Sequence, residues 1–410
     1  MESRNRTAFF VIFLTIFIDL LGFGIIIPLL PDFLKNVTMA NESMIGLVVG
    51  IFSLMQFIFT PVWGSMSDIY GRKPILVMSL AGNVVSYFLM ALVFAGIYPS
   101  LTLLIISRAL AGIFSANLSA AQSVVSDLTT KENRSKGMGI IGAAFGLGFV
   151  FGPALGGLLA FNFGYGVPLF LAVIFSLIAT LLCIFVFRET LDKSLMEENK
   201  RNFKGVTIIN FKGVHDVIAN RNVGIFVIIF FFITFSFANI HATFLLFAER
   251  KDGLSLNQED VGLLLSFIGV IGAIVQGGMI KFFKNKIGEE KSLIIGNIMT
   301  GIGLALIPFC TTIPVMLGAL TILAFGNGLN NPMVLGLISQ NVGQDEQGSV
   351  LGINQALGSL ARFLGPLWGG FIYQSFGYHS PFISGAFFMI LITIFSLYYL
   401  KPAKSIGTGS

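Results

Sequence analysis

The sequence predicts an all-α polytopic membrane protein, with twelve transmembrane helices in two pseudo-symmetric six-helix bundles. Three observations lead to this prediction: the composition, twelve long apolar stretches and an internal repeat. Of the 410 residues, 55% are hydrophobic and only 11% are charged, whereas soluble domains carry about a quarter charged residues. The mean hydropathy of +0.87 leaves too few polar groups to cover a water-facing surface of this size.

Twelve apolar stretches are long enough to cross a bilayer, which takes about 20 mostly apolar residues in a helix. The first stretch is too long for the core of a signal peptide, and no small-residue cleavage site follows it, so we expect a retained helix. The predicted spans are 7–31, 44–67, 74–95, 100–122, 137–160, 166–187, 223–248, 258–281, 292–310, 313–338, 348–375 and 379–400.

The longest polar stretch, residues 188–222, divides six helices from six. We therefore expect an N-terminal six-helix bundle over 1–187, a cytosolic central loop over 188–222, and a C-terminal six-helix bundle over 223–404. Within the loop, residues 203–218 mix apolar and polar side chains and are expected to lie along the membrane surface. Residues 405–410 are interpreted as a remnant of cloning.

The Lys and Arg residues predict the orientation, because cytoplasmic loops of membrane proteins carry an excess of both. With the N-terminus in the cytosol, 20 of the 25 fall in inside segments and three in outside segments, while Arg108 and Arg362 fall within helices. We expect both termini in the cytoplasm and the protein in the plasma (inner) membrane. This distribution explains the net charge of +5, so no nucleic-acid partner is expected.

An internal repeat relates the two halves. The stretch GMGIIGAAFGLGFVFGPALGG (137–157) is similar to VLGINQALGSLARFLGPLWGG (350–370), and Pro153 matches Pro366 at an offset of 213 residues (366 − 153). Parallel internal repeats are typical of secondary transporters, whose substrate site lies near the membrane midplane between the halves. A channel or a membrane enzyme stays open as an alternative, but the repeat favours a transporter.

The predicted turn between the second and third helices carries a spaced pattern, GSMSDIYGRKP (64–74). Asp68 can pair with a cation, Gly71 permits a left-handed turn, and Arg72 and Lys73 lie where a cytosolic loop favours positive charge. An ordinary basic turn is the alternative interpretation. The full spacing resembles the signature loop of the major facilitator superfamily, and this resemblance implies that superfamily's fold for the whole chain.

Three further stretches narrow the resemblance. SRALAGIFSAN (107–117) resembles the helix-4 motif with a buried arginine, here Arg108. GLGFVFGPALGG (146–157) resembles the helix-5 motif associated with antiporters. DLLGFGIIIPLLP (19–31) resembles the helix-1 signature of the twelve-helix drug:proton antiporters, the group that holds the tetracycline efflux proteins. The resemblance implies efflux of small amphipathic or aromatic compounds, and hence antibiotic resistance, in exchange for protons by alternating access.

Asp19 is the only one of the 20 acidic residues that the sequence places deep within a helix; the others fall at helix ends or in loops. An ionised carboxylate is costly in lipid, so enclosure favours its neutral form. Contact with water, with a substrate amine or with Arg108 favours ionisation. The hypothesis is that Asp19 carries the coupling proton or exchanges it for substrate, and the resemblance implies that Arg108 assists. A permanently paired structural Asp is the alternative.

Polar residues at membrane depth are the candidates for substrate binding, because side-chain amides avoid lipid. His241 can titrate near neutral pH, although a lone histidine can equally be a hydrogen-bonded packing residue. A minority of the 43 Phe residues are expected to line a pocket for aromatic substrates. The substrate-binding candidates are Asp19, Gln56, Asn239, His241, Asn327, Asn330, Asn331 and Gln355.

The fifth predicted helix carries small residues at a regular spacing. Gly148, Gly152 and Gly156 recur every four residues and form a smooth face against which another helix can pack closely. Pro153 removes a backbone donor and permits a bend. One interpretation is a pivot that controls leak, and plain tight packing is the alternative.

Family resemblance suggests that Asp127, at the end of the fourth predicted span, pairs with Arg72 and closes the cytosolic side. A solvated acid at a helix end is the alternative. The gating candidates are Gly64, Asp68, Gly71, Arg72, Lys73, Asp127, Gly148, Gly152, Pro153, Gly156 and Gly157.

The sequence shows no GxGxxG, Walker loop, HExxH or Cys/His cluster, so we expect no enzyme, no cofactor and no metal site. The expected partners are a small-molecule substrate, protons and the lipid bilayer, and the protein is expected to act as a monomer. A sugar or glycolipid carrier of the same superfamily is an alternative. Such a substrate would need a cavity in which hydrogen-bonding residues outnumber phenylalanines. A facilitative channel or a membrane receptor is an alternative of another class.

Overall fold

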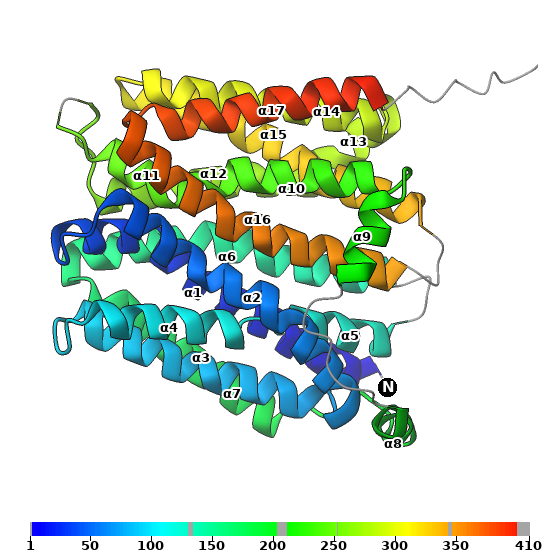
Figure 1. Ribbon diagram of the computed structural model, residues 1–410. Helices are drawn as coiled ribbons and strands as arrows, with labels where there is room; N and C mark the ends of the chain where they lie inside the picture. The colour runs from blue at the N-terminus through cyan, green and yellow to red at the C-terminus, as the bar shows by residue number, and fades with distance from the viewer. Residues whose placement is uncertain (1, 130–133, 203–210, 252, 343–346, 400–410) are drawn as a thin grey trace, which may run out of the picture.

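The computed structural model describes residues 2–129, 134–202, 211–251, 253–342 and 347–399. Every regular element in these ranges is a helix. Eleven segments in them are long and apolar enough to cross a membrane, and α16, with 30 residues, supplies the twelfth helix of the predicted set. The predicted all-α polytopic fold is therefore confirmed. Figure 1 shows the helices side by side, with the N-terminal half (blue through teal to the green α7) below the C-terminal half (green to red).

The N-terminal half contains seven helices, because the fourth predicted span is divided in two. They are α1 (Glu2–Asn36), α2 (Glu42–Tyr70), α3 (Arg72–Phe94), α4 (Leu101–Phe114), α5 (Leu118–Leu128), α6 (Arg134–Phe163) and α7 (Gly166–Phe185).

The C-terminal half repeats this plan, and two short helices precede it. The short ones are α8 (Lys193–Asn202) and α9 (Phe211–Ala219). The half itself contains α10 (Gly224–Ala238), α11 (Ile240–Ala248), α12 (Gln258–Ile274), a π-helical turn η1 (Val275–Met279), α13 (Ile280–Lys286), α14 (Glu289–Leu306), a 3-10 turn η2 (Ile307–Phe309), α15 (Ile313–Gln340), α16 (Gln347–Phe376) and α17 (Ser380–Tyr399).

The bundle has two ends. We call the linker end the one that holds the turn at Gly71 together with α8 and α9, which lie at the right of Figure 1. The opposite end holds the turns at 37–41, 95–100 and 164–165. The predicted membrane-surface segment falls partly on residues 203–210, outside the described part of the chain, and the interpreted cloning remnant, 405–410, falls wholly outside it.

Helices α6 and α16 are counterparts in the two halves. Each has 30 residues, and their bounds differ by 213 at both ends (347 − 134 and 376 − 163). Helix α6 packs on α1 of its own half and on α12 of the other, whereas α16 packs on α10 of its own half and on α2 of the other. Because α1 and α10 open the two halves, these contacts correspond pairwise, and the two bundles are pseudo-symmetric as predicted.

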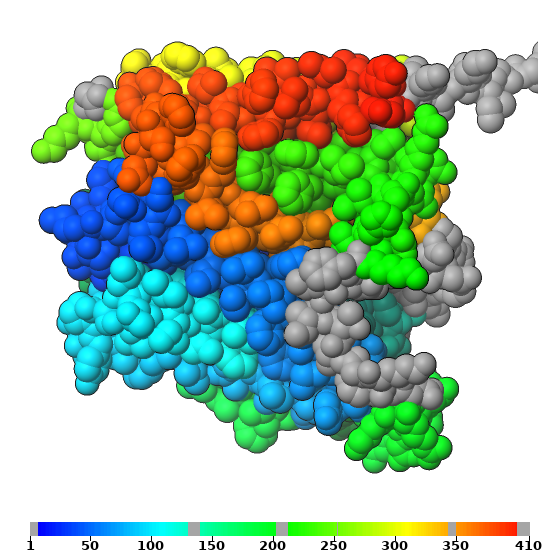
Figure 2. Space-filling model, in the orientation of Figure 1, coloured from blue at the N-terminus to red at the C-terminus, as the bar shows by residue number. Residues whose placement is uncertain are grey.

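Towards the opposite end, the two halves meet backbone against backbone at glycines. A Cβ atom on Gly50 of α2 would lie 2.7 Å from the carbonyl oxygen of Phe363 in α16, and one on Gly269 of α12 would lie 3.0 Å from that of Phe149 in α6. Both distances are shorter than ordinary van der Waals contact. In Figure 2 the blue atoms of the first helices meet the orange atoms of α16 along this seam. Further glycines that face backbone of the other half are Gly46, Gly157, Gly262 and Gly370.

Towards the linker end the same helices diverge. Among the described residues, no neighbouring atom lies within 4 Å of a Cβ atom built on Gly142 or Gly146 of α6, Gly272 of α12 or Gly352 of α16. Gly142 precedes Phe149 by two helical turns and lies on the same face of α6. The close glycine contacts between the two halves thus lie towards the opposite end, whereas these four glycines, towards the linker end, face open space.

The structure corrects three sequence-based bounds. The predicted span 100–122 is two helices, α4 and α5, separated by residues 115–117. The span 223–248 is interrupted at Asn239, between α10 and α11. Helix α1 continues to Asn36, and Asp32, which the sequence placed at a helix end, is only 1% exposed. Asp19 is therefore not the only buried acid, because α1 is one turn longer than its apolar stretch.

Candidate functional site

Asp19 lies inside α1, and its side chain is held by two amides. It is 6% exposed. Its Oδ1 accepts a hydrogen bond from Asn83 Nδ2 of α3 at 2.6 Å, and its Oδ2 accepts one from Asn117 Nδ2 at 2.8 Å. In the described part of the chain no basic side chain forms an ion pair with Asp19. The buried carboxyl is thus stabilised by neutral donors instead of a positive charge.

The break between α4 and α5 places Asn117 beside Asp19. The last carbonyl groups of a helix lack partners within the helix, and inside a membrane the protein itself must satisfy them. Here Gln56 Nε2 donates to the Ser115 carbonyl at 3.2 Å and Trp63 Nε1 donates to the Ile113 carbonyl at 2.6 Å. The side chains of α2 therefore stabilise the break, and the candidate Gln56 acts in this way rather than by contact with Asp19.

Two serines and a tyrosine complete the polar cluster around Asp19. Asn117 Nδ2 also donates to Ser79 Oγ at 2.5 Å, and Asn83 Nδ2 donates to Ser115 Oγ at 3.1 Å. Tyr87 is fully buried, with its hydroxyl 3.5 Å from the Asp19 carbonyl oxygen.

Sequence reasoning missed Asn83, Asn117 and Tyr87 as site residues. Both asparagines lie in apolar stretches, and Asn117 ends the stretch 107–117 that resembles the helix-4 motif. Their position in an apolar stretch was therefore the sequence feature that could have identified them as site residues. This feature does not indicate which amides lie next to the carboxyl, because that depends on how α3 and α5 pack on α1.

Arg108 is 1% exposed and is partnered by backbone. Its Nη2 donates to the Val49 carbonyl of α2 at 2.9 Å, and its guanidinium lies 5.0 Å from the centre of the Phe52 ring. Among the described residues Nη1 has no hydrogen-bond partner. Among the described residues, no ion pair joins Arg108 to Asp19, so the two candidate proton-coupling residues form no direct pair in this structure.

Aromatic rings gather where the two halves meet. The Phe23 ring of α1 lies 5.0 Å from that of Phe52, 6.0 Å from that of Phe149 and 5.9 Å from the His241 ring of α11, measured between centroids. His241 is 8% exposed and also lies 5.9 Å from the Phe237 ring. The structure therefore places His241 against Phe23 of α1. Phe23 lies one helical turn after Asp19 on the same helix.

The amides of the second half do not share one site. Asn239 ends α10 and donates to the Pro381 carbonyl at 2.6 Å, while its Oδ1 has no partner among the described residues. Asn330 donates to Thr300 Oγ1 of its own half at 3.2 Å. The remaining candidates, Asn327, Asn331 and Gln355, are half-buried.

One further amide of the second half, also expected from the sequence at membrane depth, is buried without partners. Asn354 of α16 is 0% exposed, and among the described residues neither of its side-chain polar atoms has a hydrogen-bond partner. On the same helix, Arg362 donates to Ser359 Oγ at 2.9 Å. Helix α16 thus carries a buried amide whose polar groups are unsatisfied.

At the linker end, Arg72 forms the predicted ion pair with Asp127. Its Nε lies 3.1 Å from Asp127 Oδ2, its Nη1 lies 2.5 Å from Asp68 Oδ1, and the same nitrogen donates to Ser67 Oγ at 2.8 Å. Gly71 has φ +99°, as its predicted turn requires. The pairing is confirmed, whereas its role in closing the linker end stays a prediction, since all these partners belong to the N-terminal half.

Glu189 adds a partner that the sequence did not indicate. Its carboxylate accepts from the backbone N–H groups of Arg72 at 2.9 Å and Lys73 at 3.0 Å, which caps the start of α3. Lys73 Nζ donates to the Ile184 carbonyl at 2.7 Å. Gly64 lets α2 approach α5, because a Cβ atom there would lie 3.2 Å from Ser119 Oγ.

The small face of α6 packs on α1 as the sequence predicted. A Cβ atom on Gly148 would lie 2.6 Å from Leu20 Cβ, and one on Gly152 would lie 2.7 Å from Gly24 Cα. Gly156 similarly faces the backbone of Ile25, and Gly157 faces the backbone of Gln258 in α12 of the other half. Pro153 lies between both helices, with its ring against Gly24 of α1 and its carbonyl oxygen against Gly262 of α12. Tight packing is therefore confirmed, and the role of this face as a pivot stays a prediction.

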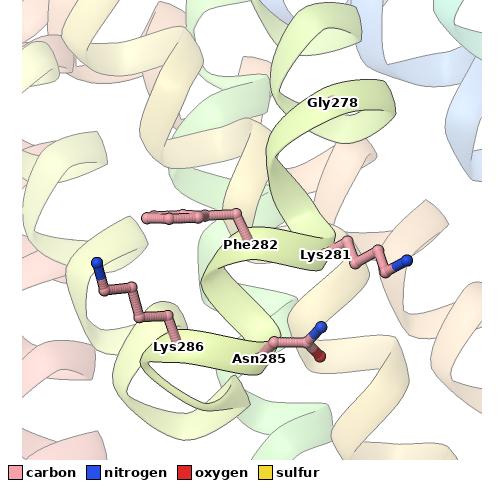
Figure 3. A pocket seen from close by; sticks show the side chains of 5 residues that line it. All are labelled: Gly278, Lys281, Phe282, Asn285 and Lys286. Carbon is pink, nitrogen blue, oxygen red and sulfur yellow. The ribbon is translucent and has the colours of Figure 1, made fainter.

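A surface hollow of about 540 Å³ lies at the linker end, away from the Asp19 cluster. It is lined by one short helical stretch, and Figure 3 shows Lys281 and Lys286 pointing to different sides of that stretch. Lys286 Nζ lies 5.2 Å from the centre of the Phe282 ring. Only residues of this one stretch line the hollow, and none of them belongs to the N-terminal half. We therefore do not assign it as the substrate site.

Comparison with known proteins agrees with this fold. The family model of the Major Facilitator Superfamily matches residues 12–286 and 279–409. The chain is 31% identical over 378 residues to the class H tetracycline resistance protein of Pasteurella multocida, covering 90% of each. It is 29% identical over 399 residues to multidrug resistance protein 2 of Bacillus subtilis, covering 95% of this chain and 94% of that one.

Two solved structures share the fold. The human organic anion transporter MFSD10 gives a TM-score of 0.71 at 23% identity, covering 96% of this chain and 99% of that one. The nucleoside transporter NupG gives 0.74 at 13% identity, covering 97% and 100%. On the family match and the tetracycline resistance relative, the chain belongs to the major facilitator superfamily.

Proposed function

We propose that this protein exports small amphipathic, mostly aromatic compounds in exchange for protons by alternating access. The observation that carries the proposal is the buried carboxyl of Asp19, which is held by the amides of Asn83 and Asn117 and not by a cation. A carboxyl in an apolar region without a positive partner changes its protonation when water or a cation reaches it. A proton and a cationic substrate can therefore compete for the same group.

The substrate class follows from the aromatic cluster. The rings of Phe52 and Phe149 each lie within 6.0 Å of the Phe23 ring, and His241 approaches Phe23 from the other half. Planar aromatic groups stack well on such rings, and an amine can approach Asp19 from there. The names of two relatives, tetracycline resistance and multidrug resistance proteins, support drug-like substrates. A polyhydroxylated sugar would find few hydrogen-bonding groups in this cluster.

The direction of export follows from the conformation and the charges. We propose the plasma membrane, with the linker end and both termini in the cytoplasm, because the basic segments gather at that end. Open space at Gly142, Gly146, Gly272 and Gly352 towards the linker end supports a conformation that admits substrate from the cytoplasm. The two bundles then rock about the Asp19 cluster, with the Arg72–Asp127 pair and the α6 glycine face as elements of the motion. No bond is made or broken, and one chain suffices.

The test uses purified protein in liposomes with an imposed proton gradient. Tetracycline and a fluorescent aromatic cation are added, and the proposal expects each to accumulate only while the gradient is present. A protonophore should abolish accumulation but leave downhill equilibration. Accumulation that ignores the gradient, or equilibration as the only activity, would indicate a differently energised carrier or a facilitative channel.

A further inference from the structure

A second pair of acidic side chains lies at the opposite end, where the two halves touch. Asp32 of α1 is 1% exposed, and Glu249, which directly follows α11, is half-buried. The carboxyl of Glu249 hydrogen-bonds that of Asp32. Two carboxyls can form such a bond only if one of them carries a proton, because ionised carboxylates are acceptors alone and repel each other.

Asp32 is the member that accepts hydrogen bonds from three other side chains. Its Oδ1 accepts from Asn36 Nδ2, and its Oδ2 accepts from the hydroxyl of Tyr165 and from Gln258 Nε2. Gln258 Nε2 also lies 3.2 Å from the Tyr165 hydroxyl. Three donors favour the charged form of the carboxyl that accepts them, so the shared proton resides on Glu249, which donates to Asp32.

These contacts cross from one half to the other. Asp32 and Tyr165 belong to the N-terminal half, whereas Glu249 and Gln258, the first residue of α12, belong to the C-terminal half. Opening this end must separate the two carboxyls and expose both to water. Neither then needs a shared proton, since hydration stabilises each carboxylate by itself.

We propose that Asp32 and Glu249 form a second proton-binding site, in which one shared proton holds the opposite end closed and is released when that end opens. The site takes a proton and no larger ligand. It rests on the proposed function only in that the chain must alternate between a closed and an open state at this end. It differs from Asp19 because the proton enters and leaves on one side and therefore gates transport without crossing the membrane.

The charged surroundings agree with this assignment. Burial raises the pKa of Glu249 to about 8, the bond to Asp32 and its charge add to the rise, and Lys35 of α1 opposes it. Burial and Asp32 also raise the pKa of Tyr165, so its phenol remains a donor. The other charged groups on the adjoining segments are Arg250, Lys251, Glu259 and Asp260.

The direction of the pH effect follows from proton counting. The closed state binds one proton more than the open state, so acid favours closure. As the pH rises from the ordinary carboxyl range towards about 8, the ratio of closed to open protein should fall by up to about tenfold per pH unit. Above that range the ratio should level off, because both states then lack the proton.

The experiment measures the distance between the halves at this end, in the full chain in lipid nanodiscs without substrate. Cys183 and Cys310 are replaced by Ser, and spin labels are attached through Tyr98→Cys and Phe376→Cys, whose parent side chains are 63% and 77% exposed. Double electron–electron resonance from about pH 5 to about pH 9 should show the short distance giving way to a longer one.

Two variants remove the titration but keep the bond. In Asp32→Asn the new amide donates to Glu249, and in Glu249→Gln the new amide donates to Asp32. Both should stay closed across the whole pH range. Ser43→Ala is the matched control, because Ser43 Oγ donates to Gln374 Oε1 at 2.6 Å across the same seam without a titrating group. It should weaken closure yet keep the pH dependence.

The same titration in Asp19→Asn separates this site from the proposed coupling site. The pH-dependent shift should persist there even if uphill transport is lost, and it should persist if Asp19 proves irrelevant to transport. A wild-type distance that ignores pH would overturn the inference. An unchanged pH shift in both Asp32→Asn and Glu249→Gln would also overturn it. So would closure at high pH that is restored by adding sodium, because the occupant of the site would then be a metal cation.

Discussion

The packing of α6 on α1 gives a sharp prediction for Gly152→Ala. A Cβ atom at this position would lie 2.7 Å from Gly24 Cα and 2.9 Å from the Leu21 carbonyl oxygen. Both neighbours are backbone, so α1 itself must move to restore contact at the usual 3.5–4 Å or so. Overpacking of this kind costs about 1–3 kcal/mol. Gly146→Ala on the same helix meets no described neighbour within 4 Å and is the matched control.

The comparison isolates the packing cost, because both substitutions gain about the same helix propensity, about 1 kcal/mol. Equilibrium unfolding in mixed detergent micelles should therefore rank Gly152→Ala about 1–3 kcal/mol below Gly146→Ala in free energy of unfolding. The displaced α1 also carries Asp19, so Gly152→Leu should reach the membrane but transport poorly or leak protons. Equal stability of the two alanine variants would refute the close-packing argument, and near-normal coupled transport by Gly152→Leu would refute the pivot.

Two further predictions concern the linker end and the Asp19 cluster. Asp68→Asn removes the charge that pairs with Arg72 Nη1 at 2.5 Å, far from the Asp19 cluster. Turnover should fall strongly while equilibrium substrate binding stays within a few-fold, and an equal loss of binding would contradict a gating role. Asn117→Leu removes the 2.8 Å donor to Asp19, worth about 1.5–3 kcal/mol for a charged acceptor. Gradient-driven uptake should fall about tenfold or more, and unchanged uptake would show that this amide does not position Asp19.

The membrane spans and the repeat could be predicted from sequence because they depend on local composition. Apolar length identifies a spanning helix wherever the helix packs, and the matched Pro153 and Pro366 report the repeat directly. The break at residues 115–117 could not be predicted in this way. The stretch 100–122 contains no proline that would mark a break. It breaks where Gln56, Trp63 and Ser79 satisfy the freed carbonyls, which is a tertiary effect.

The candidate site likewise contains one residue that the sequence identified and partners that it could not identify. Asp19 was identifiable because a carboxyl in an apolar run is costly in any packing arrangement. Its partners, Asn83 and Asn117, looked no different from the amides of the second half, since only helix packing decides which of them reaches Asp19. The bond between Asp32 and Glu249 joins residues 217 positions apart (249 − 32), and no local pattern marks it.

The central claim is that the protonation of Asp19 couples the proton gradient to export, and Asp19→Asn tests it most directly. The substitution keeps the size and the hydrogen bonding of the side chain but cannot ionise. Substrate and proton fluxes should be recorded together in liposomes from about pH 6 to about pH 8, with Asp216→Asn, at a 61% exposed side chain, as the control. The account predicts that Asp19→Asn inserts normally but loses uphill export and the accompanying proton flux, whereas the control keeps both. If Asp19→Asn still concentrates substrate against its gradient at the wild-type rate across that range, Asp19 is not the coupling group.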